Sequence, residues 1–574
     1  MSTTSRKRLW AGGLSVAAAV ALAAGLVAAV PGAERSPGAS TAPDISLVAA
    51  SPEVTLQQWE DADHRRYVDL GGLGTYVGVE GGPLELRATR ALGAEQVRVQ
   101  QFVHDGVRVI RKDLPAGLVT DLGGLPDFTE ITFTGADGET VATSRETFCP
   151  NNASARIDPG AVPVPRYPEQ CHDGPFTLGM VWGVEKGWAT NTSAGLTSVP
   201  LPLATGRYTA RISVAEKYRE IFGIADEPQT VKVNVTPPDP APNPAVDPAQ
   251  GRASAHSAHS AHSAHSGSGG RGALSGAAGR RAAEDSSYPP AVPEVPHALK
   301  QPARAALKLL GDGPGYTDGS RFAPRAKAAA RPAGPPVVPA HVPKPDLRAL
   351  PVWDIAVETE RTGEPKGRDH LAFASTTWNS GDSPLVVDGF RQSGKPLMDA
   401  YQYFYDARGR QAGHAPTGTM EWDPRVGHNH WHFTDFAAYR LLTEDRKEAV
   451  RSDKEAFCLV NTDAVDYTLK SADWRPHGTD LSSACGQGEP QALSIRQSLA
   501  VGSGDTYSRD LPGQSFDITD VPNGTYWIQV VANPSGRLHE KSFANNNAYR
   551  KIVLGGRPGA RTVTAAPLGA DQAG

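Results

Sequence analysis

Three histidines, His428, His430 and His432, stand at alternate positions in one short segment of the chain. On a β-strand, alternate side chains point to the same face, so the three imidazoles can converge on one cation. Neutral imidazole is a common ligand of both copper and zinc. The spacing therefore predicts a metal site, and three separate solvent-exposed histidines are the competing interpretation.

An extended strand would hold the outer two histidines too far apart for easy binding of one metal ion. An ideal strand would hold the Cα atoms of the outer two histidines about 13 Å apart, at about 3.3 Å per residue. That distance nearly exhausts the reach of an imidazole, so we expect a bend or bulge, or a water that completes the site. Glu421 and Asp423 are candidate acceptors that would fix the imidazole tautomers, or else loop carboxylates. The histidines alone leave open both a copper site and a hydrolytic zinc site.

Four motifs in the same region resemble those of one known family. Met420-Glu-Trp, the three histidines and the later Tyr439-Arg-Leu-Leu are similar to the copper signature of the lysyl oxidase family, although Met420 replaces a tryptophan and two additional residues precede His428. Three further segments match the family in order: Lys454-Glu-Ala-Phe-Cys458-Leu, Asp505-Thr-Tyr507 with Asp517-Ile-Thr-Asp-Val, and Asn533-Pro-Ser with Asn545-Asn-Asn. The resemblance covers roughly the C-terminal third of the chain and identifies it as a bacterial member.

The resemblance implies a copper amine oxidase. Copper would be held by the three histidines, and copper and molecular oxygen would form a lysine tyrosylquinone from Lys454 and Tyr507. The implied reaction is oxidative deamination of primary amines to aldehyde, ammonia and hydrogen peroxide. Lysine side chains of peptides or extracellular proteins suit an exported enzyme best as substrates, and free amines are the alternative.

One carboxylate is a candidate for the proton transfer that this reaction needs. Asp505 lies two residues before Tyr507, so a strand would turn both side chains to the same pocket, although a turn or cap aspartate is an equally good interpretation. Two other functions stay open for the domain. They are a non-enzymatic, metal-stabilised adhesion or envelope module, and a zinc hydrolase.

The elements that must position these residues are strands. Short segments alternate apolar and polar residues between Gly, Asp and Pro turns, as in residues 208–214, 231–235 and 526–530. We therefore predict an all-β fold with two β-sandwich-like domains, joined by a long disordered linker rich in Pro, Ala and His. The similar sequences Gly206-x-Tyr208 and Gly524-x-Tyr526 predict a similar hairpin in both domains.

Composition sets the expected boundaries. Residues 44–237 form a β-sandwich of unknown role, residues 238–346 the linker, residues 347–556 the lysyl oxidase-like domain and residues 557–574 a disordered tail. The linker holds four Ala-His-Ser repeats, which are a spacer or a loose metal-capturing tract; their histidines are His256, His259, His262 and His265.

The N-terminus and the cysteines indicate export. Residues 1–33 carry basic residues before a long uncharged run, as in a signal peptide or an uncleaved membrane anchor. We therefore expect a secreted or cell-surface protein, in which thiols oxidise. The four cysteines form two local groups, and we predict the disulfides Cys149–Cys171 and Cys458–Cys485.

The charge of the chain restricts its partners. The formal net charge is −5 and the pI is near 6.4. Such a balance disfavours nucleic acid as a partner. The order of the domains suggests that the first one binds a cell-surface partner while the linker widens the reach of the second.

Overall fold

The computed structural model describes residues 42–238 and 331–568, apart from residues 62, 106–107, 194–199, 362, 393, 426–427, 453, 455 and 478–484. The expected signal or anchor, the four Ala-His-Ser repeats and residues 239–330 of the expected linker lie outside the described residues. Within the described ranges, no helix has both the length and the apolar character needed to cross a membrane.

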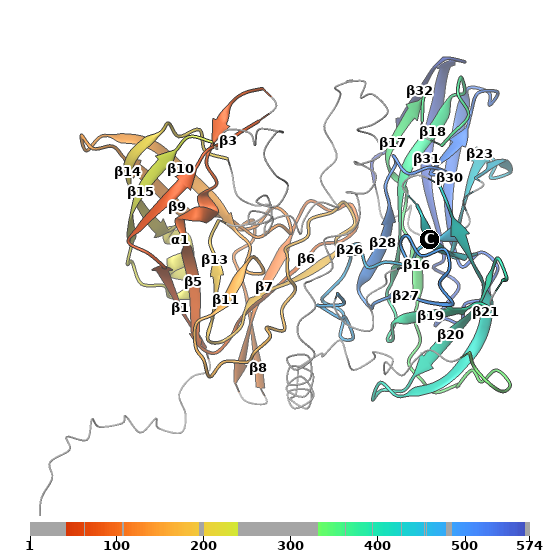
Figure 1. Cartoon of the computed structure of the whole chain (residues 1–574), viewed down its shortest axis with the longest axis horizontal. Coiled ribbons are helices and arrows are strands. Elements are labelled where there is room, and N and C mark those ends of the chain that lie inside the picture. Colours follow the sequence, from red (N-terminus) through yellow and green to blue (C-terminus); the bar gives the residue numbers. More distant parts are fainter. Residues whose placement is uncertain are drawn as a thin grey trace, which may run out of the picture. The chain divides into compact units, whose positions relative to one another are not determined.

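The first domain, residues 42–238, is built from strands in the described part (Figure 1). Its three larger sheets have the orders β1-β5-β13-β11, β10-β9-β14-β15-β2 and β12-β6-β7-β8, and β3 pairs with β4. The strands are β1 Pro43–Ala49, β2 Glu53–Gln57, β3 Trp59–Glu60, β4 Arg66–Tyr67, β5 Thr75–Gly81, β6 Leu84–Thr89, β7 Arg98–Asp105, β8 Arg108–Asp113, β9 Leu125–Thr134, β10 Thr140–Phe148, β11 Ser154–Arg156, β12 Gly179–Val184, β13 Trp188–Asn191, β14 Gly206–Val214 and β15 Gln229–Thr236; a 3₁₀ helix, η1 Leu70–Leu73, and an α-helix, α1 Glu216–Phe222, complete the elements.

The second domain, residues 331–568, also consists of strands. Its sheets have the orders β16-β18-β28-β26, with β17 and β29 on β18, β25-β22-β21-β20-β19-β27, and β24-β23-β30-β31-β32. The strands are β16 Leu347–Ala349, β17 Trp353–Glu358, β18 His370–Asn379, β19 Leu385–Phe390, β20 Met398–Tyr405, β21 Gln411–Asp423, β22 His430–Thr434, β23 Ala437–Thr443, β24 Glu448–Arg451, β25 Ala456–Phe457, β26 Asp463–Ala464, β27 Ser494–Leu499, β28 Ser503–Tyr507, β29 Ser515–Asp517, β30 Gly524–Ala532, β31 Asn547–Arg557 and β32 Ala560–Ala565.

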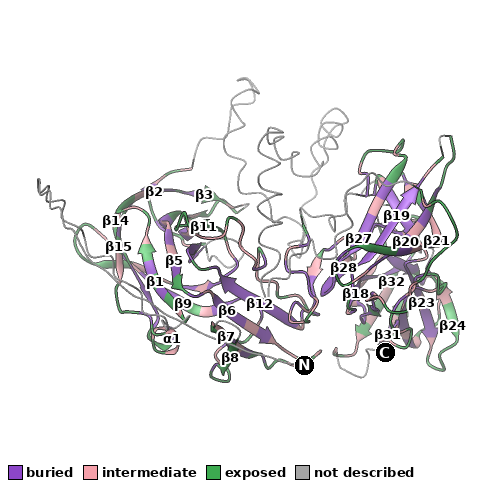
Figure 2. Cartoon of the chain, turned by 90° about the horizontal axis from the view of Figure 1, so that it is seen from below, coloured by how far each residue is buried: buried purple, intermediate pink, exposed green. Residues whose placement is uncertain are grey.

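The prediction of two β-sandwich-like domains is confirmed. Each described sheet of three or more strands draws its strands from one domain only. The expected alternation is seen on β30, where Tyr526, Ile528 and Val530 are buried. A fully buried side chain of this size contributes roughly 1.5–3 kcal/mol. Strands β18 and β19 are buried along their whole length and are purple in Figure 2.

The two domains share a hairpin of the same design. The Tyr208 hydroxyl donates to the carbonyl of Ala204 at 3.0 Å, and the Tyr526 hydroxyl donates to the carbonyl of Pro522 at 2.8 Å. A tyrosine that bonds the backbone a few residues upstream is a corner found in Greek-key sandwiches. Both tyrosines lie on a strand that pairs antiparallel with the next one, β14 with β15 and β30 with β31. The predicted similarity of the two hairpins is therefore confirmed.

Two expected boundaries of the second domain need correction. Residues 331–346 were assigned to the linker, but Val337 and His414 exchange backbone hydrogen bonds of 2.8 and 3.0 Å. Residues 557–574 were assigned to a disordered tail, but residues 560–565 form β32, which pairs antiparallel with β31. In both places backbone pairing orders a segment that has few large apolar side chains.

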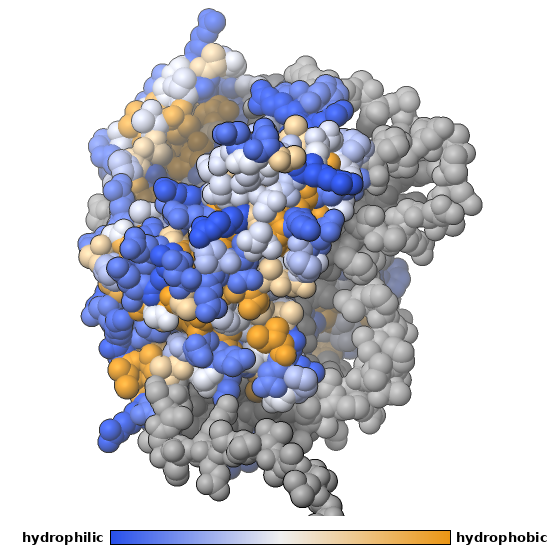
Figure 3. All heavy atoms as spheres, turned by 90° about the vertical axis from the view of Figure 1, so that its left-hand side faces the viewer, coloured by the Kyte–Doolittle hydropathy of each residue, from blue (hydrophilic) through white to orange (hydrophobic). Residues whose placement is uncertain are grey.

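Both predicted disulfides are present, Cys149–Cys171 in the first domain and Cys458–Cys485 in the second. Figure 3 shows a face on which hydrophilic side chains predominate and hydrophobic ones are scattered among them. The large apolar side chains that are exposed in the first domain are Val48, Trp59, Val109, Ile110, Val141 and Ile157.

Candidate metal and cofactor site

The histidines lie at the junction of β21 and β22. These strands pair antiparallel, with Asp423 opposite His430 and Glu421 opposite His432. His430 and His432 point to the same face of β22 because they are two residues apart. His428 precedes the strand and lies in a turn. The strand thus supplies two of the imidazoles and the turn supplies the third.

The expected bend of the chain between the histidines is confirmed. Asn429 has a φ of 52°, in the left-handed region that few residues other than glycine adopt. Asparagine tolerates this conformation better than most side chains. The bend turns His428 back toward His432, so the three ligands no longer span the length of an extended strand.

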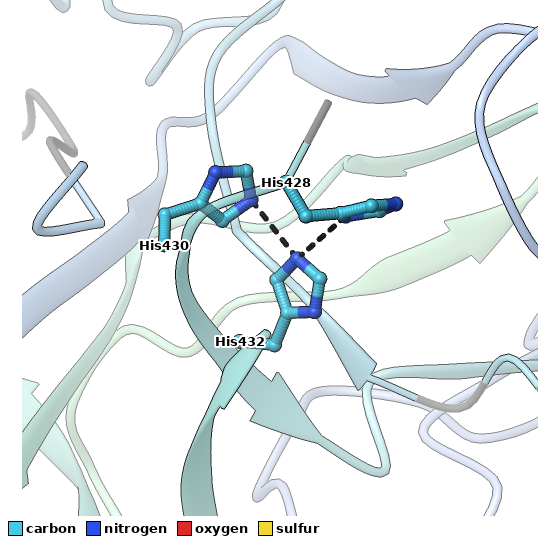
Figure 4. A group of neighbouring side chains, drawn as sticks. All are labelled: His428, His430 and His432. Atoms are coloured by element: carbon cyan, nitrogen blue, oxygen red, sulfur yellow. Dashed lines mark hydrogen bonds between the residues drawn. The ribbon is translucent and has the colours of Figure 1, made fainter. Parts of the chain in front are cut away.

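The three imidazoles converge on one point (Figure 4). His432 Nε2 lies 2.9 Å from His430 Nε2 and 3.2 Å from His428 Nδ1. The ligand atoms of all three residues lie within 4.8 Å of one another. This spacing allows one metal ion to bind the three nitrogens after a small outward shift of the rings.

The imidazoles are neutral at physiological pH. Burial lowers the pKa of His428 to about 4 and that of His432 to about 2, and the charge of Lys454 acts in the same direction on both. Burial also lowers the pKa of His430. A neutral imidazole offers a lone pair to a metal, so this donor set fits copper or zinc.

An ion pair lies beside the histidines. Arg425 donates hydrogen bonds to both carboxylate oxygens of Asp423, which lower the pKa of Asp423 although burial opposes this effect. Asp423 Oδ2 lies 3.5 Å from His432 Nδ1. Asp423 therefore occupies the expected place of an acceptor, whereas Glu421 is exposed. Both members of the ion pair belong to the segment in which the chain departs from the family signature.

Lys454 is a buried amine close to this group. Its side-chain nitrogen has no hydrogen-bond partner among the described residues. Burial lowers the pKa of Lys454 to about 7, and the charge of Arg425 adds to the effect. The Lys454 charge also acts on the pKa of all three histidines, which shows that the amine lies near them.

Tyr507 lies close to Lys454, although it belongs to a different sheet from β25, the strand that follows Lys454. It ends β28, which pairs with β18, while β25 beside Lys454 pairs with β22. The Lys454 nitrogen lies 4.6 Å from the centre of the Tyr507 ring. The Tyr507 ring packs edge-on against Phe457 at 4.9 Å, and its hydroxyl accepts a hydrogen bond from the Cys458 backbone nitrogen at 2.6 Å. The fold thus brings the predicted lysine and tyrosine together across the interior of the domain.

Asp505 belongs to the same interior. It shares a face of β28 with Tyr507, and both side chains are buried. Burial raises the pKa of Asp505 well above its usual range, and the charge of Asp463 adds to this effect. Asp505 and Lys454 influence the pKa of each other, so the carboxyl group lies near the amine.

The asparagine motifs near the end of the chain have a structural role. Asn533 and Asn546 both donate from their side-chain amides to Glu540 Oε1, at 2.6 and 2.8 Å. Glu540 Oε2 also accepts from the backbone nitrogen of Leu347 at 2.9 Å. These bonds fix the connection between β30 and β31 and tie it to β16.

Two residues of the site were missed from the sequence, Asn429 and Gln487. Gln487 Oε1 lies 2.9 Å from His430 Nδ1. The position of Gln487, two residues after Cys485, was the available signal, because the predicted disulfide already joined that turn to the segment of Lys454.

The fold and the site define the second domain as a β-sandwich with a buried three-histidine centre beside a lysine–tyrosine pair. A family model described as lysyl oxidase matches residues 401–562. Lysyl oxidase homolog 4 of Mus musculus is 34% identical over 139 residues, and lysyl oxidase homolog 3 of Homo sapiens is 30% identical over 139 residues, each alignment covering 24% of this chain and 16% of the relative. Lysyl oxidase homolog 2 of Rattus norvegicus is 32% identical over 130 residues, which cover 22% of this chain and 15% of the relative.

The second domain of the chain therefore belongs to the lysyl oxidase family. The chain spans 15–16% of the length of these relatives. The match covers the three histidines, Lys454, Asp505 and Tyr507, and it leaves out the first domain.

The bend at Asn429 predicts a difference between two substitutions. Asn429→Gly keeps the left-handed conformation without strain, so Cu²⁺ affinity stays close to that of the wild type. Asn429→Val places a β-branched residue at a positive φ, which costs about 1–3 kcal/mol and weakens Cu²⁺ binding by on the order of tenfold. Competition with a chelator of known affinity measures both. Equal affinities for the two variants would contradict the role of the bend.

The lowered pKa of Lys454 predicts a dependence of stability on pH. Above pH 7 the folded amine is neutral while the unfolded amine still binds a proton, so this group makes the folded state more stable as the pH rises. In metal-free protein, the free energy of unfolding of the wild type relative to Lys454→Met increases by on the order of 2 kcal/mol between pH 7 and 9. Urea unfolding at both pH values checks this. A difference that does not change with pH would show that the amine is charged when buried.

Proposed function

We propose that the second domain oxidises primary amines, with copper bound by His428, His430 and His432 and with a lysine tyrosylquinone made from Lys454 and Tyr507. The observation that carries the proposal is the distance of 4.6 Å between the Lys454 nitrogen and the centre of the Tyr507 ring. The amine has a pKa of about 7, so a large fraction of it is uncharged at neutral pH and keeps a lone pair for bond formation.

The cofactor forms by oxidation of the protein itself. A new bond joins the Lys454 nitrogen to a ring carbon of Tyr507, and the ring gains one oxygen atom. One molecule of oxygen supplies that atom and leaves the other as water, and a second molecule accepts the remaining two electrons and two protons as hydrogen peroxide. Phe457 packs against both partners, which restricts their relative movement before the bond forms.

The reaction converts a primary amine, oxygen and water into an aldehyde, ammonia and hydrogen peroxide. A quinone formed from Lys454 and Tyr507 would supply an electrophilic carbonyl for an uncharged primary amine. Asp505 removes the proton from the carbon beside the amine. The observation that supports this role is the position of Asp505, which is buried on the same face of β28 as Tyr507 and influences the pKa of Lys454.

The substrates proposed are lysine side chains of peptides or extracellular proteins. The names of the relatives support lysine as the amine, and the export signal expected in residues 1–33 supports an extracellular or cell-surface location. The first domain lies outside the family match, and we propose that it binds a partner at the cell surface. Deletion of residues 44–237 tests that role, because it must alter localisation or substrate range.

The cofactor assignment predicts which tyrosine is needed for activity. Copper-loaded wild type releases hydrogen peroxide when a primary amine is added in air, and Tyr507→Phe releases none above background, because the ring without its hydroxyl cannot become a quinone. Tyr526→Phe is the matched control, since Tyr526 is a corner tyrosine bonded to Pro522, and it keeps the activity. A coupled peroxidase assay measures the release. Equal release by wild type and Tyr507→Phe would contradict the quinone, and a zinc-dependent hydrolysis without peroxide would favour a hydrolase.

The proposed role of Asp505 predicts that one substitution separates cofactor formation from amine oxidation. Asp505→Asn lowers kcat roughly 10²–10⁴-fold, because the amide cannot accept the proton. The variant still forms the quinone, since Lys454 and Tyr507 are unchanged, and the visible absorbance of the cofactor shows this. Stopped-flow reduction by a primary amine compared with its α-deuterated form checks the proton transfer. An unchanged rate in Asp505→Asn would exclude Asp505 as the base.

A further inference from the structure

The turn of residues 485–489, which lies outside the strands of the site, forms hydrogen bonds with the segment that carries the histidines. The Trp431 backbone nitrogen donates to the carbonyl of Cys485 at 2.8 Å, and the Gly488 nitrogen donates to the carbonyl of Asn429 at 2.9 Å. The Trp431 indole also donates to the carbonyl of Glu489 at 3.0 Å. The turn of residues 485–489 therefore follows the backbone on both sides of His430.

One side chain of this turn contacts an imidazole directly. Gln487 Oε1 lies 2.9 Å from His430 Nδ1, while His430 Nε2 faces the other two imidazoles. A neutral imidazole carries one proton, and a metal ion needs the nitrogen without it. If Nδ1 donates its proton to the Gln487 carbonyl, Nε2 keeps its lone pair toward the metal. The contact thus selects both the tautomer and the angle of the ring.

Apart from the contacts among the three histidines themselves, the other two imidazoles have no polar contact as close as this one among the described residues. His432 Nδ1 has the Asp423 carboxylate at 3.5 Å, and His428 Nε2 is buried without a hydrogen-bond partner among the described residues. His430 is also the only one of the three histidines that is not fully buried. The least buried of the three imidazoles is therefore the one that Gln487 contacts.

The turn itself has little freedom. The Cys458–Cys485 disulfide joins it to the segment that follows Lys454. Gly486 has a φ of 65°, and a Cβ atom at that position would lie 2.5 Å from Ile495 Cδ1. Gln497 bridges the same elements, because its side chain donates to the Trp431 carbonyl and accepts from the Leu459 nitrogen.

We propose that Gln487 is a positioning residue of the metal centre, which holds His430 with Nε2 toward the metal, and that the Cys458–Cys485 disulfide keeps Gln487 in place. One covalent link then fixes two parts of the site relative to each other, the lysine segment and the ligand strand. The inference rests on the proposed function in so far as copper is the metal at the three histidines.

The test compares two substitutions of Gln487 that have similar shapes. Gln487→Met keeps the length of the side chain and lacks an acceptor, so the dissociation constant for Cu²⁺ rises roughly ten- to a hundredfold, as is usual when a partner of a metal-bound histidine is lost. Gln487→Glu keeps an acceptor, so its affinity stays near that of the wild type. The Cu²⁺ hyperfine splitting in the electron paramagnetic resonance spectrum changes in Gln487→Met and is preserved in Gln487→Glu. Gln491→Met, at an exposed position of the same segment, serves as control and changes neither property.

The outcomes separate this inference from the proposed function. Wild-type affinity and spectrum in Gln487→Met, or equal weakening in Gln487→Met and Gln487→Glu, would overturn the role of Gln487 while the copper site stands. Failure of the wild type to bind Cu²⁺ at the histidines would instead overturn the proposed function. Removal of the disulfide by Cys458→Ser and Cys485→Ser must weaken binding as Gln487→Met does, and adding Gln487→Met must then have little further effect. Full additivity of the two changes would contradict the role of the disulfide.

Discussion

An amine buried without a hydrogen-bond partner among the described residues, 4.6 Å from the centre of a tyrosine ring, is the constraint on which the rest of the site depends. A charged ammonium group in this place would be costly, so the fold lowers the pKa of Lys454 to about 7. Strand pairing fixes the elements on both sides of the contact, because Lys454 precedes β25, which pairs with β22, and Tyr507 ends β28, which pairs with β18. Lys454 and Tyr507 therefore come together only in the folded domain.

The candidate metal site likewise combines an unfavourable local arrangement with surroundings that stabilise it. Three imidazoles crowd together within 4.8 Å, and a left-handed asparagine between two of them makes this approach possible. Burial keeps the imidazoles neutral and ready to bind a metal. The segment that departs from the family signature supplies Asp423 and Arg425, so the departure adds an ion pair at the edge of the centre and leaves the ligands in place.

Much of this site could be predicted from the sequence because its information is local. Side chains alternate between the two faces of a strand, so the spacing of His430 and His432 predicted that they share one face. The distance that three histidines would span on an extended strand predicted a bend, which Asn429 provides. The pairing of Lys454 with Tyr507 came from the resemblance to the family, since no local pattern joins residues on different sheets. Gln487 could not be assigned a role, because its contact with His430 depends on a turn placed by tertiary structure. Segments 331–346 and 560–565 were misjudged from composition, because backbone pairing with a neighbouring strand orders them without large apolar side chains.

The central claim is a covalent bond between two residues that the fold brings together, and peptide mapping by mass spectrometry tests it most directly. Metal-free protein is loaded with Cu²⁺ in air, digested and compared with a sample kept without oxygen. The account predicts a cross-linked peptide pair containing Lys454 and Tyr507 in the aerobic sample alone, and its absence from Lys454→Met. Separate, unmodified Lys454 and Tyr507 peptides from a copper-loaded sample that oxidises amines would contradict it.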